Sequence, residues 1–73
     1  MKHINIISKS FGLGKNKIKP NDKVDNFNWD SMTVISLITI LNDRYSKNID
    51  LKKLKKIVYF KDIDHLIEKT IKK

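Results

Sequence analysis

The chain has 73 residues and a formal net charge of +8; its hydrophobic fraction of 40% is enough for a modest core. This length suits one small domain, residues 1–73, and is too short for an enzyme with two lobes and a cleft between them. No apolar run approaches the ~20 residues of a membrane-spanning helix, and the lack of cysteine excludes disulfides, thiolate nucleophiles and sulfur-ligated zinc.

The first expected element is a short amphipathic helix over residues 2–11, because Ile4, Ile7 and Phe11 recur at helical spacing. The two glycines of Gly12-Leu13-Gly14 are expected to end it. Residues 12–29 then form a long loop with a turn at Pro20-Asn21-Asp22. Because so much structureless chain is unusual in a small domain, we expect the loop to be pinned to the core by its apolar residues: Leu13, Ile18, Val24 and Phe27.

The second helix is the most clearly predicted element and extends to about Ser46. Asp30 and Ser31 are both suitable N-cap residues. Apolar residues then recur at steps of three or four: Met32, Ile35, Ile38, Leu41 and Tyr45. Three more widen the apolar surface beyond one stripe: Val34, Leu37 and Ile40. The helix is therefore either buried on most sides or keeps an apolar patch for a partner.

Two further helices are expected in the last third of the chain. A short lysine-rich segment, residues 49–56, is expected to turn Leu51, Leu54 and Ile57 inward. Asp62 is expected to cap a last helix, whose apolar residues are Ile63, Leu66, Ile67 and Ile71. Since no alternating strand pattern is present, the sequence predicts an all-α fold, a small four-helix bundle of three main helices and one short helix.

The positive charge lies mainly at the two ends of the sequence. Residues 1–23 and 47–73 each carry +5, whereas residues 24–46 carry −2. A strongly basic chain suggests nucleic-acid binding, yet 15 of the 16 basic residues are lysines, and proteins that read bases and phosphates favour arginine. We therefore expect no nucleic-acid partner. A small basic helical module that binds nucleic acid or another acidic surface is kept as the alternative function.

Two further expectations concern metals and location. His3 and His65 stand far apart in the sequence, so no metal site is expected. The first residues include no long apolar stretch and no small-residue cleavage site, which favours a cytoplasmic protein without a signal peptide.

Around Asp30-Ser31-Met32 the sequence resembles the acyl carrier proteins, which carry Asp-Ser-Leu, or less often Asp-Ser-Met, at the start of their second helix. The likeness covers almost the whole chain with hardly any gap. Further similar segments are residues 18–22 before this helix, residues 37–45 within it, Ile49 after it, and residues 60–63 and 66–67 around the last helix. The resemblance implies a bundle of acyl-carrier type.

The resemblance also implies a covalent cofactor, 4′-phosphopantetheine, attached to Ser31, with Asp30 and Met32 beside the attachment point. Trp29 is a secondary candidate for lining the path of the arm, and its other interpretation is a core plug or staple. Simple helix capping is the other interpretation of Asp30 and Ser31. The cofactor supplies the thiol, so the chain would be no enzyme but a carrier of thioester-bound intermediates.

The partners implied are a phosphopantetheinyl transferase, which uses a metal ion beside Asp30, an acyl- or aminoacyl-loading ligase and downstream transferases. The carrier is expected to be a monomer. Acidic residues are common along the exposed second helix and in the third-helix region of the family, and a glycine and a small residue precede the Asp. This chain instead has Asn28, Trp29, Thr33, Ser36, Asn42, Arg44, Lys52, Lys53, Lys55 and Lys56, and it retains only Asp43 as an acid on the exposed second helix.

Because complementary charge governs partner choice, this departure favours a dedicated biosynthetic pathway over general fatty-acid synthesis. Another possibility is a carrier relic whose serine is no longer modified. The sequence does not identify the carried group.

Overall fold

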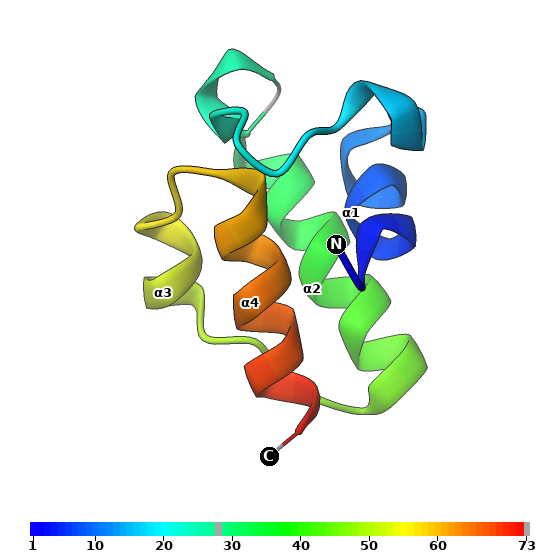
Figure 1. Cartoon of the computed structure of the whole chain (residues 1–73). Coiled ribbons are helices and arrows are strands. Elements are labelled where there is room, and N and C mark those ends of the chain that lie inside the picture. The colour runs from blue at the N-terminus through cyan, green and yellow to red at the C-terminus, as the bar shows by residue number, and fades with distance from the viewer. Residues whose placement is uncertain (28, 73) are drawn as a thin grey trace.

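The computed structural model describes residues 1–27 and 29–72. These residues form four α-helices and two short 3-10 helices: α1 (Ile4–Phe11), η1 (Lys15–Lys17), η2 (Val24–Asn26), α2 (Ser31–Tyr45), α3 (Leu51–Lys55) and α4 (Phe60–Ile71). α1 packs against α2 and α4, and α3 packs against α4 (Figure 1). The predicted all-α fold of three main helices and one short helix is confirmed, and within the described residues the only β-type pairing is an isolated bridge between Lys23 and Tyr59.

α1 is amphipathic as predicted and buries Ile6, Ile7 and Phe11. Gly12 ends it in the left-handed conformation, with φ of 66°, which a side chain would disfavour. Gly14 has an extended backbone with φ of −68°. The prediction that both glycines serve the helix end is therefore wrong for Gly14.

The loop over residues 12–29 is pinned to the core, as predicted. Ile18 and Val24 are buried, and Leu13 and Phe27 pack against the same core. Three backbone hydrogen bonds join the loop to the chain around the start of α4. The N–H of Val24 donates to the carbonyl of Val58 at 2.9 Å. In the other direction, the N–H of Phe60 donates to the carbonyl of Asp22 at 3.2 Å, and that of Lys61 to the carbonyl of Pro20 at 3.1 Å. These bonds satisfy backbone groups that a buried loop would otherwise leave unpaired.

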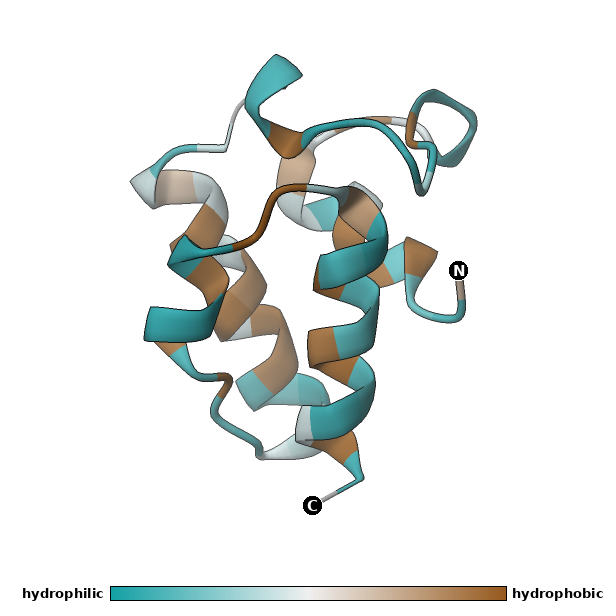
Figure 2. Ribbon diagram, turned by 60° about the vertical axis from the view of Figure 1, so that its left-hand side comes forward, coloured by the Kyte–Doolittle hydropathy of each residue, from teal (hydrophilic) through white to brown (hydrophobic). Residues whose placement is uncertain are grey.

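α2 buries only part of its apolar surface. Its buried residues are Thr33, Leu37 and Leu41. Met32 is 71% exposed and Ile35 55% exposed, so of the two alternatives left open by the sequence the structure shows the exposed apolar patch. Figure 2 shows hydrophobic residues crowded along α2, and this crowding conceals the phase of the helix in the sequence. The helix keeps an exposed apolar patch at its N-terminal end.

The starts of α3 and α4 also differ from the predictions. α3 buries Leu54 but leaves Leu51 44% exposed, so the inward placement of Leu51 was wrong. α4 begins at Phe60, before the expected cap. Asp62 instead lies in its first turn and accepts a hydrogen bond from the backbone N–H of Tyr59 at 3.0 Å. The full burial of Phe60 accounts for the earlier start.

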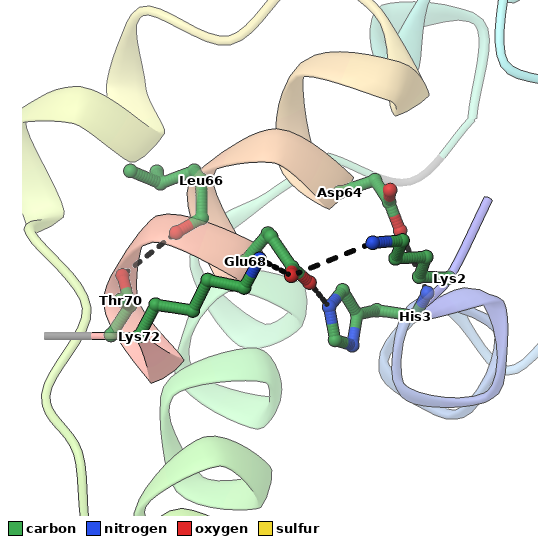
Figure 3. Close-up of polar contacts among 7 residues, drawn as sticks. All are labelled: Lys2, His3, Asp64, Leu66, Glu68, Thr70 and Lys72. Carbon is green, nitrogen blue, oxygen red and sulfur yellow. Dashed lines mark hydrogen bonds and ion pairs between the residues drawn. The ribbon is translucent and has the colours of Figure 1, made fainter.

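The N-terminal residues are clasped to α4 (Figure 3). The backbone N–H of His3 donates to Asp64 Oδ1 at 2.7 Å, and the His3 ring is hydrogen-bonded through Nε2 to Glu68. Lys72 Nζ and Lys2 Nζ lie 2.9 and 3.8 Å from Glu68 Oε1. The His3 hydrogen bond, followed by Lys72, lowers the pKa of Glu68 from its ordinary 4.5 to about 2.

This clasp predicts a specific pH dependence of stability. A carboxyl whose pKa is lower in the folded chain stabilises the fold above its unfolded pKa, and this contribution is lost as the pH falls through the folded pKa. Glu68→Gln should therefore lower the melting temperature at neutral pH, and the difference from the parent should shrink between pH 4.5 and about 2. Thermal unfolding followed by circular dichroism measures it.

The matched control is Asp43→Asn, which removes an exposed carboxyl on α2. It should lower the melting temperature at neutral pH less than Glu68→Gln does, because no ion pair is formed by Asp43 within the described residues. If the difference in melting temperature between Glu68→Gln and the parent stays constant down to pH 2, Glu68 does not stabilise the fold through these contacts.

Candidate functional site at the start of α2

Asp30 caps α2. Its backbone is extended, with φ of −117° and ψ of −178°. Its Oδ1 accepts two hydrogen bonds from Thr33, one from the backbone N–H at 3.0 Å and one from the hydroxyl at 3.1 Å. The backbone N–H of Thr33, followed by its hydroxyl, lowers the pKa of Asp30. The predicted capping role is confirmed, and it places an ionised carboxylate at the positive end of the helix.

Ser31 occupies the first helical position and is exposed. Within residues 1–27 and 29–72, no side chain or backbone group is hydrogen-bonded to its hydroxyl. Because Asp30 caps α2, the Ser31 hydroxyl is not needed as the helix cap. An oxygen at this position is accessible to an enzyme, and a phosphate ester formed on it would lie near the positive end of the dipole of a 15-residue helix.

Trp29 anchors the chain immediately before the cap. Its ring stacks on Phe11, with centroids 5.5 Å apart and an angle of 11° between the planes. Phe11 in turn meets the buried Phe60 edge to face at 5.0 Å. The aromatic contact supports the interpretation of Trp29 as a core plug. Asn28, the other unusual residue before Asp30, lies outside the described residues.

A groove of about 540 Å³ opens beside Ser31. Its walls come from the chain before α2, from α2 and from α3: Trp29, Asp30, Ser31, Val34, Ile35, Ile38, Leu51 and Lys55. It therefore brings together three of the four predicted site residues. Met32, the fourth, is exposed and does not line it. Trp29 both packs on the core and faces this groove, so its two interpretations are compatible.

Sequence reasoning missed the contribution of α3 to this groove. Leu51 and Lys55 follow Ser31 by about two dozen positions, and only the packing of the chain brings them to its side. The spacing of these two residues was the available signal, because residues four apart share one face of a helix.

The lysines of α3 and its C-terminal end are exposed: Lys52, Lys53, Lys55 and Lys56. In the part of the chain that the structure describes, none of them forms an ion pair. A second hollow, of about 240 Å³, lies between α3 and α4, and the exposed His65 contributes to its wall.

The described residues offer neither a metal-binding cluster nor a membrane-spanning helix. No group of three or more histidine, aspartate or glutamate side chains there could hold a metal ion. None of the described helices has the length and hydrophobicity needed to cross a membrane.

No protein-family model matches this chain, and no curated protein matches it either.

Measurements of stability can test whether Asp30 or Ser31 caps α2. Asp30→Ala removes both hydrogen bonds to Thr33 and should lower the urea midpoint of unfolding. Ser31→Ala removes no bond and should change the unfolding free energy by about 0.5 kcal/mol or less. Urea titrations followed by circular dichroism provide both values. A larger loss for Ser31→Ala than for Asp30→Ala would show that the serine is the cap.

Proposed function

We propose that this chain is a carrier protein that holds acyl or aminoacyl groups as thioesters on a 4′-phosphopantetheine arm attached to Ser31 Oγ. One observation above all supports the proposal. Ser31 is exposed at the first position of α2 and has no hydrogen-bonding partner among the described residues, while Asp30 alone provides the cap. The helix therefore does not need this hydroxyl, which is free for modification.

The residues at this end of α2 fit the cofactor. A phosphodiester on Ser31 would be favoured by the dipole and N-terminal N–H groups of the helix. The adjoining groove is walled mainly by Trp29, Val34, Ile35, Ile38 and Leu51, which suits an apolar group carried on the arm. When bound, the arm supplies the thiol that this cysteine-free chain lacks. The chain itself presents the attachment oxygen and orients the arm.

The resemblance of Asp30-Ser31-Met32 and its surroundings to acyl carrier proteins supports the same assignment. The arrangement of three main helices and a short α3 is compatible with a bundle of acyl-carrier type. The partners would be a phosphopantetheinyl transferase, a loading ligase and downstream transferases.

A dedicated pathway remains the preferred setting for this carrier. Near Ser31, α2 exposes Met32 and Ile35 instead of a row of acids. Enzymes that recognise a carrier by an acidic second helix would find little complementary charge there.

One observation favours the alternative, a basic module for nucleic acid or another acidic surface. The four exposed lysines at α3 form no ion pairs within the described residues and would be available to phosphates. Such a module would bind with steep salt dependence and would have no use for Ser31.

The proposal predicts modification at one hydroxyl. Incubation with a broad-specificity phosphopantetheinyl transferase and coenzyme A should add the mass of one phosphopantetheinyl group, located on Ser31 by peptide mass spectrometry. Ser31→Ala should abolish the gain and keep the helical circular dichroism spectrum.

Ser36→Ala, on the same helix, is the matched control and should gain the same mass as the parent. A parent chain that gains no mass, or a Ser31→Ala variant that still gains it, would rule out the carrier assignment. The basic module or the carrier relic would then remain.

A further inference from the structure

We propose that the second hollow, between α3 and α4, binds an oxyanion of the phosphate type through Lys53 and Lys69, with the ring of His65 as a further donor. This hollow shares no lining residue with the groove beside Ser31, so the proposal does not depend on the carrier function. It depends on three features of the structure: the separation of charges on α4, the lack of partners for the basic side chains, and the chemistry of the hollow's walls.

The acidic residues of α4 are bound on the side of the helix that faces the N-terminal segment. Asp64 Oδ1 accepts a hydrogen bond from the backbone N–H of His3 at 2.7 Å. Glu68 is hydrogen-bonded to the His3 ring and lies 2.9 Å from Lys72 Nζ. Figure 3 shows both carboxylates turned toward His3. These two negative charges are therefore compensated locally.

The basic residues that follow these acids lie on the face toward α3. His65 and Lys69 are four apart, so they share one face of α4, and both line the hollow. Leu66 lies between them on that face, and Figure 3 shows it on the other side of α4 from both acids. Because α3 packs against α4, Lys53 of α3 completes the wall.

The basic side chains of the hollow have no partners. Lys53, His65 and Lys69 are exposed, and no ion pair joins any of them to another residue in the described parts of the chain. Asp62 is the one carboxylate in the wall, and its Oδ2 accepts a hydrogen bond from the backbone N–H of Tyr59 at 3.0 Å. An anion could therefore bind the two lysines without breaking an existing ion pair.

The walls suit a phosphate better than a simple carboxylate. Leu66 is buried and Ile57 half-buried, and apolar walls strengthen a charge interaction by lowering the effective dielectric constant. The volume of about 240 Å³ is several times the ~30 Å³ that a water molecule occupies in the liquid. A phosphate group offers three acceptor oxygens and more than one negative charge, which matches donors supplied by three side chains from two helices.

The test is a titration of the whole chain with inorganic phosphate, followed by NMR at constant ionic strength. The backbone amide signals of Lys53, His65 and Lys69 should shift and reach saturation, whereas acetate at the same ionic strength should cause smaller shifts. Lys69→Gln and Lys53→Gln should each weaken phosphate binding by about threefold to fivefold, the loss expected for one exposed ion pair. Raising the sodium chloride concentration should weaken binding to the parent, because exposed charge pairs are screened.

Lys56→Gln is the matched control, because it removes the same charge from an exposed lysine that does not line the hollow. It should bind phosphate as the parent does. All three variants should keep the helical circular dichroism spectrum, since none of these lysines forms an ion pair within residues 1–27 and 29–72.

Two outcomes would overturn the site. In the first, phosphate and acetate cause the same unsaturated shifts in the parent. In the second, Lys56→Gln weakens phosphate binding as much as Lys69→Gln, so that only the net charge of the chain matters. Neither outcome bears on Ser31, and a chain that fails to gain a phosphopantetheinyl group could still bind phosphate in this hollow.

Discussion

The full burial of Leu37 and Leu41 fixes the rotation of α2 about its axis, and the candidate site depends on that rotation. Residues four apart lie on one face of a helix, so these leucines form a single contact with the core. Burying each side chain contributes about 1.5–3 kcal/mol. Met32 and Ile35 lie on the opposite side of the helix, so turning them toward the core would expose both leucines. The core therefore leaves Ser31 and the apolar patch beside it at the surface.

Two local interactions then hold the start of α2 in place. On the core side, Trp29 stacks on Phe11, which meets Phe60, so the residue before the cap is tied to α1 and α4. On the helix side, Asp30 binds the backbone N–H and hydroxyl of Thr33. Because both anchors lie next to Ser31 without using its hydroxyl, the serine is positioned by its neighbours. A modification on Ser31 would thus leave the interactions that fix this end of the helix intact.

The sequence predicted those features that local spacing determines. The helices, the pinned loop and the cap at Asp30 depend on residues close together in the chain, so periodicity and capping preference could find them. The phase of α2 was left open because apolar residues surround most of this helix, and spacing alone could not choose between Leu37 and Ile35 as the buried side. The start of α4 was missed because burial of Phe60 outweighed the capping preference of Asp62. The clasp between His3 and Glu68 and the groove shared by Ser31 and Lys55 bring together residues that are distant in the sequence, for which no local pattern exists.

The charge of the groove beside Ser31 differs from the net charge of the whole chain. The net charge is +8, but the groove beside Ser31 presents one anion, Asp30, and one cation, Lys55. Long-range attraction follows the net charge and governs how fast a partner arrives, whereas affinity depends mainly on desolvated contacts at the centre of an interface. Met32 and Ile35 offer exposed apolar side chains for such contacts next to Ser31. If the chain is the proposed carrier, a partner that loads it would therefore need an apolar surface at its centre and acidic residues at its rim, the reverse of the charge that an acidic carrier selects.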